Sequence, residues 1–364
     1  MHIFYDYQIF SLQKMGGISR YFVELASRMP VYSPVIETTV LAPVHINEYL
    51  DCSSVHKIGR KIPSFPGMHR ILPAINRIAS RAILKGQCPD ILHETYYSAT
   101  SLPVAVPRIL SVYDMIHERF PSQFKGPDLD IPKLKEKAIA RADHLIAISN
   151  NTRDDLIEYL SVSPEKITVI PLASSIEKPE ENKDVENCQR PYLLYVGLRG
   201  GVKNFKRLLS AFSHSTILRS EFDLICVGGG GFTSEELSTF DGLSMSERIK
   251  HLSADDTLLA SLYSHAALFV YPSLYEGFGL PLLEAMRCGC PIACSNTSAM
   301  PEIAGEAAMF FDPSDEEEMR VVIESTVQSK ETVTLLRTHG YEREKMFSWD
   351  NCVSQTAELY RSKV

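Results

Sequence analysis

The chain has 364 residues, of which 45% are hydrophobic and 23% are charged. This length favours two domains, and the composition is that of an ordinary globular protein rather than a disordered or fibrous one. The net charge of −8 argues against general nucleic-acid binding, because counterion release requires a basic surface. No stretch reaches the roughly 20 apolar residues that span a bilayer, and the N-terminus lacks a signal-peptide pattern, so a cytoplasmic location is expected.

In the first half, short β-branched runs alternate with helix-length amphipathic segments, which is typical of parallel sheets covered by helices. We expect strands at His2–Tyr7, Val35–Leu41, Asp90–His93, Arg108–Asp114, His144–Ser149 and Lys166–Ile170. A helix follows the first strand, because apolar residues recur there at spacings of three and four. Gly16 and Gly17 precede this helix, where bare backbone N–H groups could approach an anion; a simple turn is the alternative.

The segment from Cys52 to Pro89 contains no Asp or Glu, and its basic residues are Lys57, Arg60, Lys61, Arg70, Arg77, Arg81 and Lys85. Within it, Arg70–Lys85 can form an amphipathic helix whose apolar residues are Ile71, Ile75, Ile78 and Ile83. Such a basic 57–85 segment suits an anionic bilayer surface and a diphosphate-lipid acceptor, and predicts peripheral association with the inner face of the cell membrane. A packed helix with a solvated basic face is the alternative.

A polar stretch without periodicity, Pro171–Pro191, predicts the domain boundary. We expect one domain at 1–172 plus a returning C-terminal helix in 350–364, and a second at 173–349. In the second half the pattern restarts, with strands near Tyr192–Gly197, Phe222–Gly228, Leu268–Tyr271, Pro291–Ser295 and Ala308–Phe311 and helices near Lys203–His214, Thr257–His265 and Leu280–Cys288. The fold class predicted is α/β, with two doubly wound Rossmann-like parallel-sheet domains.

Ligands of such sheets bind beyond the carboxyl ends of strands, where this chain has glycine-rich turns. After the first strand of the second half, Gly197 is followed by two cations, Arg199 and Lys203, at the start of a helix. Two cations at a helix N-terminus suit a diphosphate, whereas the alternative is a solvated pair of surface charges. The run Gly228–Gly231 is interpreted as a turn with a role in base contact.

The strongest signal runs from Glu276 to Glu284, directly after the apolar strand Leu268–Tyr271. Its glycines, Gly277 and Gly279, expose backbone amides before a helix that carries Glu284. An ionised carboxylate accepts paired O–H donors, so two carboxylates eight positions apart could hold the vicinal hydroxyls of a sugar and a ribose. Two surface glutamates are a poor alternative, because the neighbours of Glu284 are apolar.

A metal site is not predicted. The eight cysteines contain no C-x-x-C pair, and Cys288, Cys290 and Cys294 have no nearby His to complete a zinc set. The pair Asp128 and Asp130 lies in a proline-bounded polar stretch and is interpreted as a loop.

The E-x7-E element resembles that of the retaining glycosyltransferases of family 4 (GT4), which have the GT-B fold. The flanking sequences Tyr271-Pro-Ser and Pro301-Glu-Ile-Ala-Gly, and the pairs Gly16-Gly17 and Lys203-Asn204, extend the resemblance over nearly the whole chain. The resemblance implies two Rossmann-like domains facing a central cleft, a nucleotide-sugar donor, a saccharide or lipid-linked acceptor, and neither cofactor nor metal.

The resemblance also implies roles for individual residues. Glu284 would bind the ribose, Glu276 would face the donor hexose, and Arg199 and Lys203 would neutralise the diphosphate. The remaining donor contacts expected are Gly16, Gly17, Gly197, Leu252, Ser253, Gly277, Phe278, Gly279 and Leu280.

The chain departs from the family after the strand Arg108–Asp114, where many relatives carry a histidine that approaches the donor sugar. Here the sequence offers Tyr113, Asp114 and His117, of which we favour Asp114 and His117. A role in the core or behind the site is the alternative for each.

The resemblance leaves the substrates open, because loops rather than the fold decide them. A UDP-hexose such as UDP-glucose or UDP-galactose is favoured as donor, and GDP-mannose comes next. The competing function is that of a non-catalytic sugar-nucleotide-binding subunit of a glycan-assembly complex; a sugar-nucleotide epimerase is less consistent with the motifs.

Overall fold

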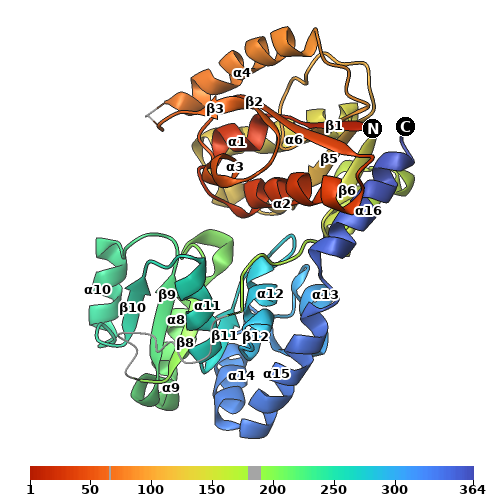
Figure 1. The fold of residues 1–364 in the computed structure, drawn as a ribbon. Coiled ribbons are helices and arrows are strands. Elements are labelled where there is room, and N and C mark those ends of the chain that lie inside the picture. Colours follow the sequence, from red (N-terminus) through yellow and green to blue (C-terminus); the bar gives the residue numbers. More distant parts are fainter. Residues whose placement is uncertain (65–66, 179–189) are drawn as a thin grey trace. The chain divides into compact units, whose positions relative to one another are not determined.

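The computed structural model describes residues 1–64, 67–178 and 190–364. It forms two compact units, one made of Met1–Leu172 and Trp349–Val364 and the other of Ala173–Ser348, and each is a parallel sheet with helices on both faces (Figure 1). The predicted α/β class with two doubly wound sheets is confirmed. The middle of the predicted linker, residues 179–189, lies outside the described residues.

The first unit contains a seven-stranded sheet in the order β3-β2-β1-β4-β5-β6-β7. Its strands are β1 (His2–Tyr5), β2 (Glu37–His45), β3 (Lys57–Lys61), β4 (Ile91–Glu94), β5 (Arg108–Val112), β6 (His144–Ala147) and β7 (Ile167–Val169). Its helices are α1 (Gln8–Leu12), α2 (Gly17–Tyr32), α3 (Glu48–Cys52), α4 (Met68–Leu84), α5 (Ile116–Arg119), α6 (Ile131–Arg141), α7 (Asn150–Leu160) and α16 (Trp349–Arg361). Asp128 and Asp130, predicted in a loop, lie in a short 3-10 helix, Gly126–Asp130.

The second unit contains a six-stranded sheet in the order β10-β9-β8-β11-β12-β13. Its strands are β8 (Tyr192–Val196), β9 (Asp223–Val227), β10 (Ile249–Leu252), β11 (Leu268–Tyr271), β12 (Ile292–Ser295) and β13 (Ala308–Phe311). Its helices are α8 (Phe205–His214), α9 (Thr216–Glu221), α10 (Ser234–Gly242), α11 (Asp256–His265), α12 (Leu280–Arg287), α13 (Met300–Ala304), α14 (Glu316–Gln328) and α15 (Lys330–Glu344). Phe205, Leu208 and Phe212 of α8 are buried in its core, which explains the apolar spacing of that helix.

The predicted amphipathic helix is α4, and it packs on the first sheet through a narrow stripe. Leu72 and Asn76 are buried, and the Asn76 amide bonds both the N–H and the C=O of Val44 in β2, at 2.7 and 2.8 Å. The three isoleucines Ile71, Ile75 and Ile78 are 51%, 44% and 67% exposed. The helix therefore presents to solvent the apolar residues that an ordinary packed helix would bury.

The C-terminal helix α16 belongs to the first unit. The ring of Trp349 stacks on that of Tyr21 in α2, with centroids 6.4 Å apart, and this contact places Trp349 in the first unit although the sequence assigned it to the second domain. Farther along α16, the Tyr360 hydroxyl lies 2.6 Å from His93 Nδ1 of β4, and His93 Nε2 lies 2.9 Å from the Ser111 hydroxyl of β5. All three residues are buried, so this polar chain anchors α16 to the sheet.

The anchor predicts acid sensitivity of the first unit. Burial lowers the pKa of His93 to about 3, whereas a histidine in an unfolded chain titrates near 6.5. As the pH falls below 6.5, the unfolded chain gains a proton that folded His93 does not take up, so the free energy of unfolding falls until about pH 3. This group contributes about 1.4 kcal/mol per pH unit over that window.

The measurement is denaturant unfolding followed by the fluorescence of Trp349, the sole tryptophan of the chain, at pH 7 and pH 5. In His93→Gln, which cannot titrate, the loss of unfolding free energy between these pH values should be smaller than in the wild type by about 2 kcal/mol. Equal losses in the two proteins would contradict the assignment.

Among the described residues, no helix has both the length and the apolar character needed to cross a membrane.

Candidate functional site

The second sheet has its topological switch point beside β8, whose neighbours are β9 on one side and β11 on the other. Because all its strands are parallel, the turns after β8, β9, β10 and β11 lie along the same edge. Ligands of open α/β sheets bind at this edge, in the crevice where the strand order reverses.

Two hydrogen bonds join the turn after β8 to the turn after β11. Leu274 N–H donates to the Val202 carbonyl at 2.7 Å, and the side-chain amide of Asn204 donates to the Pro272 carbonyl at 2.9 Å. Asn204 adopts a left-handed conformation with φ of 59°, as asparagine readily does. These hydrogen bonds bring Lys203 and Glu276, which are 73 positions apart in the sequence, together at the switch point.

Lys203 and Glu276 form an ion pair. Lys203 Nζ lies 2.6 Å from Glu276 Oε1, and the side chains are 25% and 13% exposed. The N–H of Glu276 donates to the Ser298 hydroxyl at 2.9 Å, which fixes the loop that carries the carboxylate. The switch point thus holds a partly exposed cation and anion in direct contact; an ammonium can pair with a phosphate, and a carboxylate can accept hydrogen bonds from hydroxyls.

The loop after Glu276 leads into the N-terminus of α12. Gly279 precedes the helix with φ of 105°, and a Cβ there would lie 3.1 Å from Leu282 Cδ1, so glycine is required. Phe278 is buried and meets the ring of Phe347 edge-on, with centroids 5.9 Å apart. Gly277 lies in the loop before α12, and Leu280 is the first residue of this helix, at a helix start that favours an anion.

Glu284 lies on α12, one turn after its start, and is half-buried. The hydroxyl of Tyr263 in α11 donates to Glu284 Oε2 at 3.2 Å. A tyrosine donor holds this carboxylate in one orientation, which supports the predicted role in binding paired hydroxyls.

Arg199 was predicted to bind the diphosphate, but in the structure its side chain binds other groups. Its Nε donates to Glu236 Oε1 at 2.7 Å, and its terminal nitrogens donate to the carbonyls of Gly228, Gly230 and Gly231 at 2.8 to 2.9 Å. The guanidinium also lies over the ring of Phe232, and the side chain is 5% exposed. Because its donors are engaged with the glycine loop, Arg199 orders that loop in this structure, and Lys203 is the cation that meets Glu276.

The other predicted donor contacts of this unit follow neighbouring strands. Gly197 donates its N–H to the Val227 carbonyl at 2.9 Å, and a Cβ on Gly228 would lie 3.3 Å from the Gly197 carbonyl oxygen, so the two turns pack backbone to backbone. Leu252 ends β10 and is half-buried, while Ser253 is exposed just beyond it. These residues line the edge of the sheet on the β9 and β10 side of the switch point.

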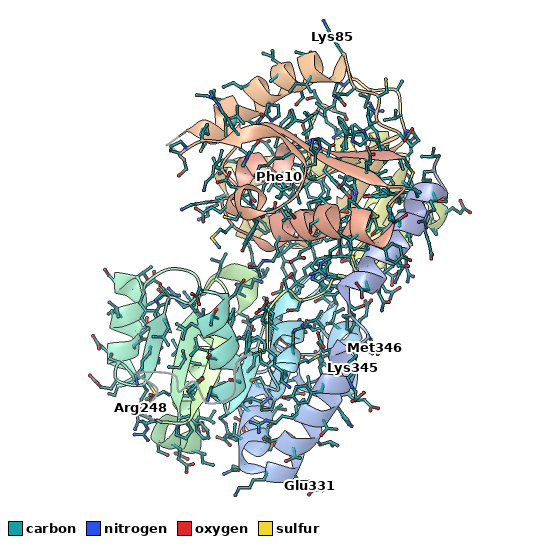
Figure 2. All side chains as sticks on the ribbon, in the orientation of Figure 1. Phe10, Lys85, Arg248, Glu331, Lys345 and Met346 are labelled. Carbon is teal, nitrogen blue, oxygen red and sulfur yellow. The ribbon has the colours of Figure 1, made fainter. Side chains whose placement is uncertain are left out.

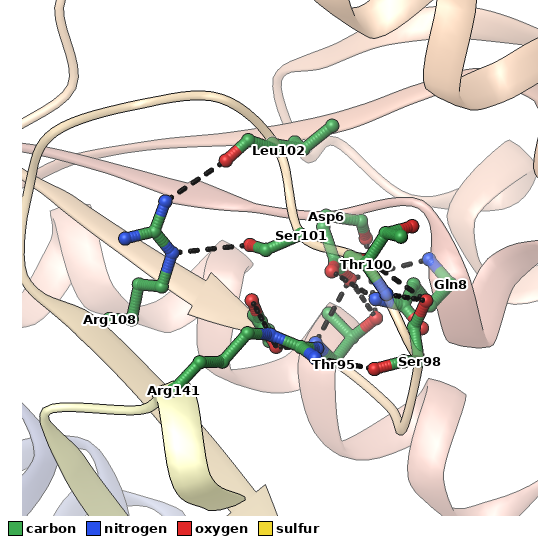
Figure 3. A network of polar contacts seen from close by, with 10 residues as sticks. Asp6, Gln8, Thr95, Ser98, Thr100, Ser101, Leu102, Arg108 and Arg141 are labelled. Carbon is green, nitrogen blue, oxygen red and sulfur yellow. Dashed lines mark hydrogen bonds and ion pairs between the residues drawn. The ribbon is translucent and has the colours of Figure 1, made fainter. Parts of the chain in front are cut away.

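The first unit has its own switch point between β1 and β4. There Asp6 is buried and accepts hydrogen bonds from Thr95 N–H at 2.9 Å, from the Thr95 hydroxyl at 2.6 Å and from Gln8 Nε2 at 2.9 Å (Figure 3). Burial, together with the nearby Glu94 carboxylate, raises the pKa of Asp6 to about 6, although the hydrogen bonds from Thr95 and Gln8 act in the opposite direction. The sequence did not single out this network, which joins the ends of the two strands.

The three residues after β5 that were candidates for contact with the donor sugar, Tyr113, Asp114 and His117, have different surroundings in the structure. Tyr113 is buried, and its hydroxyl donates to the Thr95 carbonyl at 3.0 Å, so it serves the core. Asp114 is 33% exposed, and its Oδ1 accepts from Ile116 N–H at 3.1 Å. His117 is half-buried against the ring of Phe124, and its pKa is lowered, first by burial. Asp114 and His117 remain as the polar groups beyond the strand.

Gly16 and Gly17 stand at the N-terminus of α2 as predicted. The Gln13 side chain already accepts from Ser19 N–H at 3.2 Å, and a Cβ on Gly16 would lie 2.5 Å from Gln13 Oε1. Part of the anion-binding capacity of this helix start is therefore used by Gln13.

Within residues 1–64, 67–178 and 190–364, no three His, Cys, Asp or Glu side chains gather as metal ligands would. Cys288, Cys290 and Cys294 are buried, and burial raises the pKa of each thiol.

Two family models match consecutive parts of the chain: Glycosyltransferase Family 4 over residues 15–177 and Glycosyl transferases group 1 over residues 177–343. O-antigen chain mannosyltransferase B of Escherichia coli is 32% identical over 240 residues, which cover 63% of each protein. The serotype-specific mannosyltransferase WbdA of Escherichia coli is 31% identical over 226 residues, covering 58% of this chain and 28% of WbdA. The matches thus span less than two thirds of either relative.

Among solved structures, sucrose-phosphate synthase of Thermosynechococcus elongatus superimposes with a TM-score of 0.80 at 18% identity, covering 99% of this chain and 98% of that one. At this identity the likeness establishes the fold.

Proposed function

Since the chain belongs to the glycosyltransferases of family 4 and group 1, we propose that it transfers a hexose from a nucleotide-diphosphate sugar to a saccharide acceptor of polysaccharide synthesis. The observation that carries the proposal is the contact of Lys203 with Glu276 at the switch point of the second sheet. In this proposal Lys203 and the N-terminus of α12 bind the diphosphate, Glu276 binds hydroxyls of the hexose, and Glu284 binds the ribose.

The mechanism proposed is transfer with retention of the anomeric configuration. As the bond from the anomeric carbon to the diphosphate breaks, negative charge grows on the leaving oxygen, and the Lys203 ammonium lies where it stabilises that charge without a metal ion. The leaving phosphate takes the acceptor proton on the same face. Glu276 accepts hydroxyl protons of the hexose and orients the ring, so it need not act as a nucleophile.

In the first unit, we assign contact with the saccharide to Asp114 and His117. Asp114 is partly exposed beyond β5. The lowered pKa of His117 keeps its ring neutral near pH 7, and a neutral imidazole ring can donate one hydrogen bond and accept another. A neutral ring suits sugar hydroxyls, which are themselves both donors and acceptors.

Two donors deserve testing. The names of the two sequence relatives above favour a mannosyl donor such as GDP-mannose. A UDP-hexose, favoured from the sequence alone, is the second candidate, because the proposed contacts of Glu284 and Lys203 are to ribose and diphosphate and are independent of the base.

The test is incubation with labelled GDP-mannose, UDP-glucose and UDP-galactose, with and without lipid-linked saccharide from bacterial membranes. Transfer, or slow release of free hexose in the α configuration by NMR, supports a retaining transferase. Donor binding without turnover would instead establish a sugar-nucleotide-binding subunit, and interconversion of donors would establish an epimerase.

We also propose that α4 attaches the protein to an anionic membrane surface that carries its acceptor. Ile71, Ile75 and Ile78 recur at helical spacing on the exposed side of α4, and exposed Arg81 and Lys85 follow at its end; Lys85 projects into solvent in Figure 2. An apolar row with cations beside it fits the headgroup boundary of a bilayer. Beside β3, an open hollow of ≈540 Å³ is lined in part by Lys57, Arg60 and Lys61 and adds positive charge, partly offset by Asp51.

Co-sedimentation with phosphatidylglycerol vesicles measures this attachment. Arg81→Glu/Lys85→Glu should lower the partition coefficient roughly 30-fold, and Ile75→Ser/Ile78→Ser should lower it roughly 100-fold at any salt concentration. The matched control is Val31→Ser/Val35→Ser, which alters two other exposed apolar residues, 84% and 70% exposed, and should bind as the wild type does. Wild-type binding by both α4 variants would refute the membrane contact.

A further inference from the structure

Lys135 of α6 is fully buried, with 0% of its side chain exposed. It occupies the inward stripe of the helix together with Ala138 and Ile139. Lysine is almost never fully buried unless its ammonium is paired, because the charge loses its hydration. Its partners therefore show what the residue is for.

All of these partners belong to the turn after β5 or to the loop beside it. Lys135 Nζ donates to the Asp114 carbonyl and to Glu118 Oε2, both at 2.8 Å, and lies 3.8 Å from Asp114 Oδ1. It also lies 5.2 Å from the centre of the Tyr97 ring. One ammonium thus joins both ends of the segment from Asp114 to Glu118, and His117 lies inside that segment.

The segment needs such support. Helix α5 has four residues, too few for a helix to hold its shape by its own hydrogen bonds. On its other side, Tyr113 N–H donates to the Tyr97 hydroxyl at 3.2 Å, and Tyr113 in turn donates to the Thr95 carbonyl. Since Thr95 binds Asp6, the turn after β5 is tied to the switch point of its own sheet.

A purely structural role does not account for this arrangement. Replacing a buried ion pair by apolar residues of similar volume is often neutral or stabilising, so stability alone does not require Lys135 and Glu118. The ammonium is placed on the backbone of Asp114, the residue that carries the partly exposed carboxylate, and its charge contributes to the lowered pKa of His117.

We propose that Lys135 is a positioning residue that holds the turn Asp114–Glu118 so that Asp114 and His117 face the saccharide. The proposal rests on the assignment of saccharide contact to these two residues. Lys135 itself is buried and touches no substrate; it acts through the backbone of Asp114 and through the charge that it places near His117.

The charged groups that face His117 are Asp114, Glu118, Asp128 and Lys135. The three carboxylates raise the pKa of His117, whereas burial and Lys135 lower it. Removal of the Lys135 charge should therefore raise the pKa of His117, and a larger fraction of the ring should be protonated near neutral pH.

Three variants test the proposal: Lys135→Met, Lys135→Arg, and Lys135→Met/Glu118→Leu, which removes the pair together and leaves no buried charge. The matched control is Lys166→Met, because Lys166 binds another backbone carbonyl of the same unit, that of Ile139, at 2.8 Å. Each is assayed for kcat and donor KM with the donor that the wild type turns over, for its unfolding midpoint, and for His117 titration by NMR with labelled histidine.

We expect the double variant to have the same unfolding midpoint as the wild type. Its kcat should fall about 100-fold with little change in donor KM, because displacing a group that positions the substrate by about 1 Å lowers the rate by about that factor. Lys135→Met should raise the pKa of His117, Lys135→Arg should recover part of kcat, and Lys166→Met should do neither. A well-folded double variant with wild-type kcat would overturn the proposal.

The titration separates this proposal from the proposed function. If the wild type turns over no donor, the transferase assignment fails, while an unchanged His117 pKa in folded Lys135→Met would refute the positioning role by itself.

Discussion

Replacing Lys203 with Met is expected to lower kcat about 100- to 1000-fold, the usual cost of removing one preorganised donor from a developing negative charge. Lys203 reaches the switch point because hydrogen bonds from the Leu274 N–H and from the Asn204 side-chain amide join the turns after β8 and β11, and its ammonium lies 2.6 Å from Glu276. Arg199 does not compensate, since its guanidinium is engaged with the Gly228–Gly231 loop and Glu236. The measurement is turnover at saturating donor.

Two controls keep this result interpretable. Lys206→Met alters a lysine three residues on, whose side chain is 90% exposed and pairs loosely with Glu235 at 3.7 Å, and it should leave kcat unchanged. Lys203→Met/Glu276→Gln avoids an unpaired Glu276 carboxylate, so it tests whether the loss follows from the missing cation rather than from a disturbed loop. Wild-type kcat in well-folded Lys203→Met would show that another group neutralises the leaving diphosphate.

The central strands could be predicted from the sequence, and two edge strands could not. Buried parallel strands such as Leu268–Tyr271 are continuous apolar runs, which the sequence displays directly. The missed strands, β3 and β10, contain Lys-Ile-Gly-Arg-Lys and Ile-Lys-His-Leu and lie at the edges of their sheets. An edge strand is covered on fewer sides, so its composition resembles that of a loop.

For the site, positions along the sheet edge could be predicted, but the direction of each side chain could not. Glycine turns after strands marked Lys203 and Glu276, because parallel topology brings such turns to one edge. The orientation of Arg199 depends on Glu236, which itself caps α10 by binding Thr233 N–H at 2.7 Å, a tertiary arrangement invisible in the local sequence. Lys135 did leave a signal, a cation at helical spacing from buried Ala138 and Ile139.

Replacing Glu284 with Ala is expected to weaken donor binding roughly 100-fold or more, because two hydrogen bonds from ribose hydroxyls to an ionised carboxylate would be lost together. The carboxylate is half-buried on α12, and the Tyr263 hydroxyl, 3.2 Å from Oε2, sets its orientation. Isothermal titration calorimetry with the nucleoside diphosphate alone separates the contribution of Glu284 from that of Glu276, because this ligand lacks the hexose that Glu276 is proposed to bind.

Tyr263→Phe is the matched control for orientation. It keeps the carboxylate and the buried ring and removes one neutral donor, so it should weaken nucleoside-diphosphate binding by about 1 kcal/mol, far less than Glu284→Ala. Glu276→Gln should leave that affinity nearly unchanged and weaken binding of the intact donor instead. Unchanged nucleoside-diphosphate affinity in folded Glu284→Ala would show that Glu284 does not bind the ribose. A loss of affinity in Glu276→Gln as large as that in Glu284→Ala would show that both carboxylates bind the same part of the donor.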